Sequence, residues 1–256
     1  MKTILITNDD GYESIGLKAL ISSLQDIARI LIVAPASEKS ACGHGLTLTK
    51  PLRFVKISDD FYKLDDGTPS DCIYLALNTF GIKPDLIISG INIGSNMGED
   101  VTYSGTVAGA MEGAIREIPS LAISQIVDDK AMVFDSDFAL AKEVVRDLVE
   151  KIFDSTFPLN GRKLLNVNIP KTTKSHYKGI KITQLGYRIY GNDAHLHRNP
   201  RGEEYYWLGL HPLAWNERAD NNSDFKAVLD GYTSITPIML DLTSYNDIKT
   251  MESWIK

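Results

Sequence analysis

The chain has 256 residues, 43% hydrophobic and 23% charged, which predicts an ordinary globular protein with one large domain or a core with a smaller extension. Its net charge of −6 and its pI of about 5.4 argue against the basic surface that binding to duplex nucleic acid requires. No apolar run approaches the roughly 18 residues of a membrane span, and the N-terminus does not resemble a signal peptide. The only cysteines are Cys42 and Cys72, too few for a disulfide framework, so a cytoplasmic location is expected.

The chain opens with a short apolar strand that ends in two adjacent acids. Residues 4–7 form the strand, and the sequence Asn-Asp-Asp-Gly follows at residues 8–11. Because ligands bind at the carboxyl ends of parallel strands, Asp9 and Asp10 are expected at the mouth of a crevice. Adjacent carboxylates repel each other, and a hard divalent cation is the simplest way to hold them together. The alternative is a turn that merely favours Asx residues.

Strand and helix patterns alternate along the chain to about residue 170. Apolar runs predict strands at residues 4–7, 29–35, 46–49, 53–57, 85–90, 121–124 and 164–169. Helices are expected between them, beginning near residues 15, 69 and 104, and a longer one covers 138–152 with Asp135 as its cap. Thr68 is the expected N-cap of the second helix, with Asp71 at its N3 position. This alternation predicts a doubly wound, mostly parallel α/β sheet in three layers.

The pattern changes beyond residue 170. Residues 180–185 and 204–208 read as strands that flank a polar segment, which predicts a projecting hairpin. A late strand at 231–237 and a short helix at 248–255 follow. With no internal repeat, residues 1–256 are expected to form a single domain. Its α/β core would be residues 1–170, and its hairpin and C-terminal extension, residues 171–256, would decorate the core or meet another subunit.

Three loops at strand ends carry most of the polar side chains: residues 8–11, 37–43 and 89–98. Together they offer two carboxylates, an alcohol and amide oxygens, an all-oxygen set that suits Mg²⁺, Mn²⁺ or Ca²⁺ rather than zinc. Residues 104–106, Ser-Gly-Thr, begin a helix whose exposed N–H groups can hold an anion. A hard cation beside such a helix start indicates phosphate-ester chemistry, in which a metal-bound water attacks phosphorus.

Other enzyme templates fit less well. The acids at positions 9 and 10 are adjacent, whereas a covalent aspartyl-phosphatase needs carboxylates two residues apart. The chain has no Walker phosphate loop, and no G-x-G-x-x-G motif follows its first strand. No G-x-S-x-G nucleophile elbow is present either, which weakens a serine hydrolase.

Six segments, in the same chain order, resemble the SurE (survival protein E) family of metal-dependent 5′/3′-nucleotidases. They are 7–11, 33–35 with Ser40, 67–72, 89–96, 103–107 and 231–237. The resemblance implies a Rossmann-like core and metal-dependent hydrolysis of nucleoside 5′- and 3′-monophosphates, with polyphosphate as a further substrate of some members. It also implies a cytoplasmic dimer or tetramer, in which the segment 187–204 extends the assembly and the C-terminal tail exchanges between subunits.

The resemblance also implies residue roles. One divalent ion, Mg²⁺ or Mn²⁺, would be held by Asp9, Asp10, Ser40 and Asn92. The substrate phosphate would lie against Asn96, Ser104, Gly105 and Thr106. Asp9 and Asp10 would also be catalytic, with Asp10 assisting proton removal from the attacking water.

Two alternatives to a nucleotidase remain open from the residues alone. The same fold could be a non-catalytic nucleotide-binding module, which would bind nucleotide tightly without releasing phosphate. It could also be a structural oligomer whose acidic loop binds Ca²⁺ for assembly. Three positions depart from the usual family pattern, and they bear on substrate preference and turnover more than on reaction class: Lys39, Ser95 and Tyr187.

Overall fold

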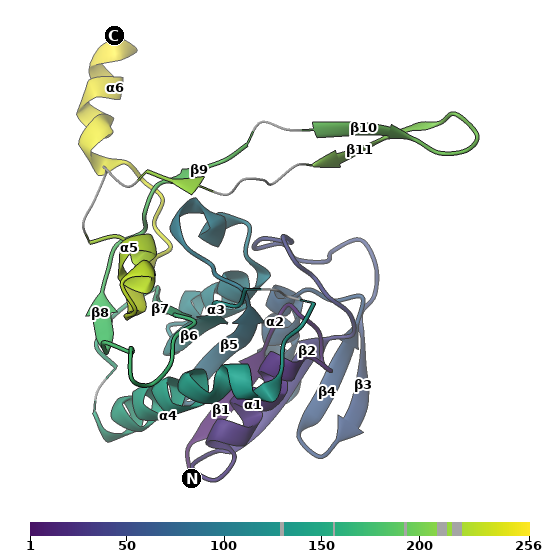
Figure 1. Ribbon diagram of the computed structural model, residues 1–256, viewed down its shortest axis with the longest axis vertical. Helices are drawn as coiled ribbons and strands as arrows, with labels where there is room; N and C mark the ends of the chain where they lie inside the picture. Colours follow the sequence, from purple (N-terminus) through teal and green to yellow (C-terminus); the bar gives the residue numbers. More distant parts are fainter. Residues whose placement is uncertain (129–130, 156, 192–193, 209–213, 217–221) are drawn as a thin grey trace.

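A nine-stranded sheet with helices on both faces forms the body of the protein (Figure 1). The computed structural model describes residues 1–256 except 129–130, 156, 192–193, 209–213 and 217–221. The strands of the sheet are β1 (Thr3–Thr7), β2 (Arg29–Pro35), β3 (Arg53–Ser58), β4 (Phe61–Asp65), β5 (Leu86–Ile93), β6 (Ser120–Gln125), β7 (Lys163–Ile169), β8 (Ile180–Ile182) and β13 (Thr233–Met239). The helices around it are α1 (Ile15–Leu24), α2 (Pro69–Thr79), α3 (Gly105–Ile115), α4 (Ala139–Asp154) and α5 (Asp224–Leu229), with 3-10 turns η1 (Gly98–Thr102) and η2 (Asp135–Phe138).

The first strand shows how the two faces of the sheet are covered. Successive side chains of a strand point to opposite faces. Ile4 and Ile6 are buried in one cluster with residues of α1 and α4, whereas Leu5 is buried in another with Ile73 of α2. In Figure 1, α1 and α4 lie in front of the sheet, and α2 and α3 lie behind it. The predicted three-layer, mostly parallel α/β fold is therefore confirmed.

The strand order reverses its direction at β1. The order is β3-β4-β2-β1-β5-β6-β7-β13-β8, and all neighbours are parallel except β3 with β4 and β13 with β7. From β1 the chain first winds outward to β2 and β4, and then returns through α2 to β5 on the other side of β1. Such a reversal opens a crevice outside the carboxyl ends of the two central strands. The loop that holds Asp9 and Asp10 leaves β1 at this point.

Two local predictions are wrong for tertiary reasons. Residues 46–49 form no strand, because the backbone N–H and the hydroxyl of Thr47 both donate to Asp71, at 2.9 and 2.6 Å. Asp71 in turn completes the predicted capping box with Thr68 at the start of α2. Asp135 is not the cap of the long helix: it begins η2 and pairs with Lys142 at 2.7 Å, and α4 itself starts after Phe138. The half-buried strand β4 was not predicted.

The sheet extends beyond residue 170. Strand β13 pairs with β7 in antiparallel fashion and with β8 in parallel, so the late strand belongs to the same sheet as the first. The expected division between core and extension therefore does not coincide with an edge of the sheet. Strand β5 also continues to Ile93, three residues past its expected end at residue 90.

A hairpin projects from the body of the protein as predicted (Figure 1), but one of its two strands was predicted wrongly. Residues 204–208 pair with residues 194–198, whereas the expected strand at 180–185 contributes β8 to the central sheet, where β13 is its partner. We call strands β10 (Ala194–Arg198) and β11 (Glu204–Leu208) the arm, and the antiparallel pair β9 (Arg188–Ile189) and β12 (Ala214–Trp215) the arm root. After β13, the turn η3 (Tyr245–Asp247) and helix α6 (Ile248–Trp254) form the C-terminal tail. Among the described residues, no helix is long and apolar enough to cross a membrane.

Candidate active site at the carboxyl edge of the sheet

The loops that follow β1, β2 and β5 meet at one edge of the sheet. The backbone N–H of Lys39 donates to the carbonyl oxygen of Asp9 at 2.7 Å, which joins the second loop to the first. The backbone N–H of Ile93, the last residue of β5, donates to Asp10 Oδ2 at 3.1 Å. Three segments that are far apart in the sequence therefore enclose the two adjacent acids, as the strand-end argument requires.

Asp9 lies directly against the start of α3. The carboxylate is 4% exposed, and its Oδ1 accepts the hydroxyl of Thr106 at 2.5 Å. A Cβ at Gly105 would lie 2.8 Å from Asp9 Cβ and 2.9 Å from both Asp9 Oδ2 and Cys42 Sγ. Such distances are too short for a real contact, so only glycine permits this approach. The helix start and the first acid thus form one tightly packed unit.

Asn8 fixes the direction in which the two acids leave β1. Its amide nitrogen donates to the carbonyl oxygen of Gly11 at 2.9 Å and to Ser14 Oγ at 2.8 Å. Ser14 is at the same time the N-cap of α1, where its hydroxyl accepts from the N–H of Leu17. No role was predicted for Asn8, although a polar residue between a strand and two acids is a typical turn former.

The remaining predicted metal ligands differ in exposure. Asn92 is buried, and its amide nitrogen donates to Gly94 O at 2.9 Å, which leaves its oxygen as the end able to meet a cation. Ser40 lies on an exposed turn and donates its hydroxyl to Glu38 Oε1 at 2.6 Å. A hydroxyl that donates a hydrogen bond keeps its lone pairs, so Ser40 can still act as a ligand.

These residues fit a hard, partly hydrated cation. Two carboxylates, one amide and one hydroxyl are all oxygen donors, and Mg²⁺ in particular keeps several waters when proteins supply few ligands. Among the described residues, no group of three or more His, Cys, Asp or Glu side chains could hold a metal ion. A metal at this edge would therefore depend on the serine and asparagine oxygens as well as on Asp9 and Asp10. The donor chemistry suits Mg²⁺ or Mn²⁺ and does not suit a thiolate zinc site.

Cys42 packs into this edge of the sheet, where its thiol has low reactivity. Burial, followed by the nearby charge of Asp9, raises the pKa of its thiol to about 11. A thiol with this pKa is protonated at neutral pH, and only the thiolate is a good nucleophile or metal ligand. Cys42 acts as a small packing residue, because its Sγ lies only 2.9 Å from where a Cβ at position 105 would be.

The second loop is also bonded to α3 and to the residues just before it. The backbone N–H of Gly43 donates to the carbonyl oxygen of Tyr103 at 2.9 Å, just before α3. His44 Nε2 lies 3.3 Å from Oε2 of Glu112, a nearly buried carboxylate within α3. This contact joins the second loop to α3 across 68 residues of sequence.

The predicted phosphate-binding residues offer mainly backbone groups. Ser104 is the N-cap of α3 and accepts the N–H of Val107 at 3.0 Å, and the Thr106 hydroxyl is engaged by Asp9. The first N–H groups of a helix have no partner within it, so those of Gly105 and Thr106, both buried residues, are the backbone groups that an anion would have to reach here.

Nearly every polar atom of Asn96 forms a hydrogen bond with a residue of the sheet. Its N–H donates to Asn168 Oδ1, its amide nitrogen donates to Ser124 Oγ, and its carbonyl oxygen accepts from Asn166 and Asn168, at distances of 2.8–2.9 Å. These bonds hold the loop after β5 above β6 and β7. Only the amide oxygen of Asn96 could meet a substrate.

The chain is similar over most of its length to a known protein family. The family model described as "Survival protein SurE" matches residues 4–192. The chain belongs to the SurE family. Two SurE relatives, each named "5'-nucleotidase SurE", cover the full length of both chains: one from Wolinella succinogenes is 67% identical and one from Helicobacter hepaticus is 63% identical. The crystal structure of the SurE protein from Aquifex aeolicus is 41% identical, covers 99% of this chain and 100% of its own, and superposes with a TM-score of 0.82.

Proposed function

We propose that this SurE-family protein is a divalent-metal-dependent phosphomonoesterase. It hydrolyses nucleoside 5′- and 3′-monophosphates to nucleoside and phosphate, with short polyphosphate as a further substrate class. The names of the full-length relatives support 5′-nucleotidase activity. The observation that carries the proposal is the direct contact between the Asp9 carboxylate and Thr106 in the first turn of α3. That contact places a carboxylate of the kind that binds metal ions beside a helix start that can bind an anion, both at the carboxyl end of β1.

The chain's own groups divide the work of hydrolysis. Asp9, Asp10, Ser40 and Asn92 would hold one Mg²⁺ or Mn²⁺ ion, which supplies charge neutralisation and a water of lowered pKa when bound. Asp10 accepts the proton of the attacking water. The N–H groups at the start of α3 stabilise the negative charge that builds on the non-bridging phosphate oxygens. Thr106 donates to Asp9 and keeps that carboxylate in position.

Phosphate release from nucleotides tests the proposal. The purified protein is incubated with 5′-AMP, 3′-AMP or tripolyphosphate in Mg²⁺ or Mn²⁺, and phosphate is measured with and without EDTA. We expect release that EDTA abolishes and that added metal restores. Tight AMP binding without release would instead support a nucleotide-binding module. Dissociation of an oligomer by EDTA, seen by gel filtration in a protein without phosphatase activity, would support the structural Ca²⁺ hypothesis.

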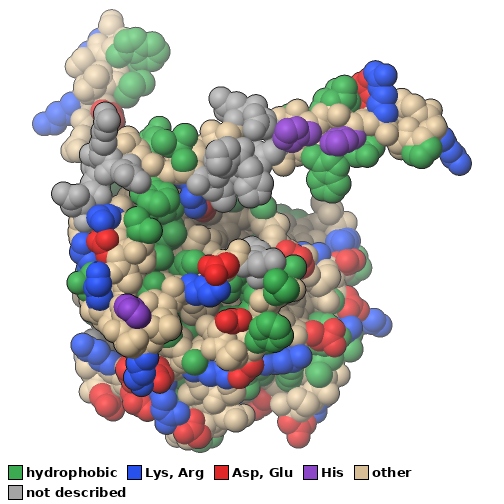
Figure 2. All heavy atoms as spheres, viewed as in Figure 1, with side chains coloured by type: hydrophobic (Ala, Val, Ile, Leu, Met, Phe, Trp, Pro, Cys, Tyr) green, Lys and Arg blue, Asp and Glu red, His purple; other side chains and the backbone are tan. Residues whose placement is uncertain are grey.

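We also propose that the chain assembles with copies of itself, as a dimer or tetramer, through the arm and the C-terminal tail. Both carry large hydrophobic side chains that are exposed in a single chain, among them Leu196, Tyr206, Trp207, Leu208, Trp254 and Ile255. Figure 2 shows hydrophobic and histidine side chains gathered on the projecting arm. Apolar patches of this kind mark surfaces that another molecule covers.

A further inference from the structure

The turn η1 connects the loop of Asn96 to the start of α3. Its central residue, Asp100, accepts two backbone N–H groups on its carbonyl oxygen, from Tyr103 at 3.0 Å and from Ser104 at 3.1 Å. Ser104 is the N-cap of α3. The position of Asp100 therefore determines where the helix that contacts Asp9 begins.

Both carboxylate oxygens of Asp100 are held, one by Arg188 of the arm root and the other by Tyr190, the residue that follows β9. Arg188, which is only 7% exposed, donates to Asp100 Oδ2 through Nε at 2.9 Å and also through Nη2. The Tyr190 hydroxyl donates to Asp100 Oδ1 at 2.9 Å. The backbone N–H of Arg188 donates to Glu99 Oε2 at 2.6 Å. Two neighbouring acids of η1 are thus bound by one short segment that leads to the arm.

The guanidinium of Arg188 is fixed from its other side. It lies over the ring of Phe225, 4.5 Å from the ring centroid, and that ring stacks on Trp215 of β12 at 5.5 Å. A planar guanidinium can stack on an aromatic face while its N–H groups bind a carboxylate. Lysine carries the same charge but has neither the plane nor the fork, so it cannot satisfy both contacts in the same way.

A second carboxylate joins the same two segments. Asp224 is fully buried and accepts the N–H of Gly98 at 2.8 Å and the N–H of Gly186 at 2.9 Å. Gly98 begins η1, and Gly186 lies two residues before β9. A Cβ at Gly98 would lie 2.7 Å from the carbonyl oxygen of Gly186, so the two backbones are in close contact. The arm root and η1 are therefore packed as one unit.

We propose that Arg188 is a positioning residue for the candidate active site, acting through Asp100 on the first turn of α3 and through Thr106 on Asp9. The arm root is therefore attached to η1, the turn that determines where α3 and its proposed phosphate-binding N–H groups begin. The effect on turnover rests on the proposed nucleotidase function, whereas the positioning itself does not.

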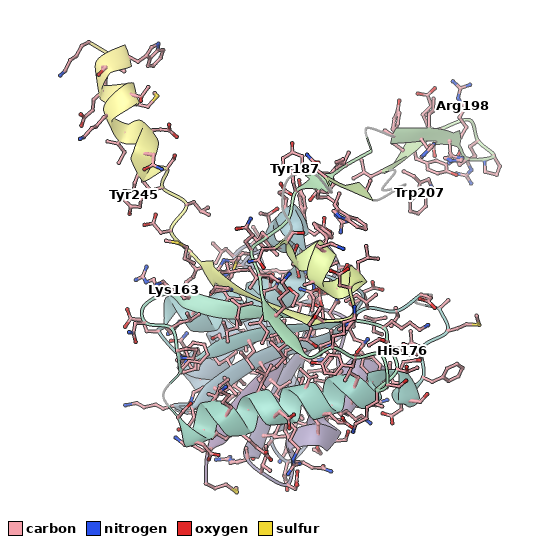
Figure 3. All side chains as sticks on the ribbon, turned by 60° about the vertical axis from the view of Figure 1, so that its left-hand side comes forward. Lys163, His176, Tyr187, Arg198, Trp207 and Tyr245 are labelled. Atoms are coloured by element: carbon pink, nitrogen blue, oxygen red, sulfur yellow. The ribbon has the colours of Figure 1, made fainter. Side chains whose placement is uncertain are left out.

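Hydrogen exchange with two arginine variants tests the proposal. Arg188→Lys removes the fork and the stacking but keeps the charge. Arg198→Lys is the matched control, because Arg198 also pairs with a carboxylate, that of Glu204, but lies exposed on the arm (Figure 3). We expect the amides of Tyr103, Ser104 and Val107 to exchange at least about 10-fold faster in Arg188→Lys, with no change in exchange in β1 or β6. Arg198→Lys should stay within about 2-fold of the original protein. The kcat for AMP should fall about 10-fold in Arg188→Lys only.

Distinct outcomes would overturn the proposal. Unchanged exchange at residues 103–107 in folded Arg188→Lys would refute it, and so would a uniform increase across all strands, which would indicate a purely structural role. If Arg188→Lys does not fold, Tyr190→Phe decides the question, since it removes only the hydroxyl bond to Asp100 and should raise exchange at Tyr103 and Ser104 about 3-fold. Absence of phosphate release by the original protein would refute the proposed function but leave the exchange result to decide the positioning role.

Discussion

The candidate active site, at the carboxyl edge of the sheet, and the arm differ in what surrounds their side chains. At the edge, Asp9 is 4% exposed and Thr106 is fully buried, and both contact residues from distant parts of the chain. On the arm, every residue of β10 and β11 is exposed, including Trp207 and Leu208. A two-stranded ribbon is marginally stable by itself, whereas a strand end packed between helices is rigid. The candidate active site is thus enclosed by packed residues of one chain, whereas the arm exposes the apolar side chains through which we propose that it contacts another copy.

Arg188 lies where these two regions join, and this explains why it differs from the other arm residues. Its side chain is buried and bound on two sides, whereas Arg198 further along the arm is exposed. A mutational series across the two regions should therefore show large effects on activity at the edge and effects on assembly at the arm.

The largest effect is expected for Asp9→Asn. The amide keeps the shape of the side chain but loses the charge that holds a divalent cation, so kcat for AMP should fall by about 100- to 1,000-fold in saturating Mn²⁺. Asp59→Asn is the control, since Asp59 pairs with Lys56 at an exposed position. Unchanged phosphate release from the Asp9 variant would end the metal-site interpretation.

Gly105→Ala should follow, with a loss of activity of about 10- to 100-fold. The new methyl group would lie 2.8 Å from Asp9 Cβ and would push the carboxylate out of place. Gly45→Ala provides the comparison, because there the nearest atom would be Cys42 O at 3.5 Å. Steady-state kinetics and thermal melting measure the two effects separately. Full activity in folded Gly105→Ala would show that the close approach of α3 has no importance for catalysis.

Thr106→Val tests the hydroxyl alone. Valine has nearly the same shape but cannot donate to Asp9 Oδ1, so the Mn²⁺ concentration needed for half-maximal activity should rise about 10-fold. Thr106→Ser keeps the hydroxyl and should remain close to the original protein. An equal loss in both variants would point to packing at this position instead of the hydrogen bond.

The arm should give the smallest effect on the folded chain. The double substitution Trp207→Ser and Leu208→Ser removes exposed apolar surface, so the free energy of unfolding of one chain should change by less than about 1 kcal/mol. The mass measured by light scattering after gel filtration should decrease, whereas Ile57→Ser, at an exposed position on β3, should leave it unchanged. An unaltered mass for the arm variant would show that assembly uses another surface.

Local sequence chemistry was sufficient for the elements that depend on near neighbours. The capping box of Thr68 and Asp71 was readable because its two residues lie three apart and serve one helix start. The strand at 46–49 was predicted wrongly because the alternating pattern carries no information about Asp71. This residue lies 24 positions later and accepts hydrogen bonds from the N–H and the hydroxyl of Thr47, so the N–H is not available to a neighbouring strand. Strand β4 was missed because only one of its five residues is fully buried, so its apolar pattern is weak although it pairs with β2 and β3 on its two sides.

The sequence by itself determined that two acids follow a buried strand in an alternating α/β chain, since hydrophobic periodicity and turn chemistry are local properties. Only the tertiary structure decided that Thr106 orients Asp9 across 97 residues and that Arg188 holds Asp100 across 88. Such partners are chosen by how strands and helices pack in space. A side chain's type states what it can bind, whereas the fold decides which group comes within reach.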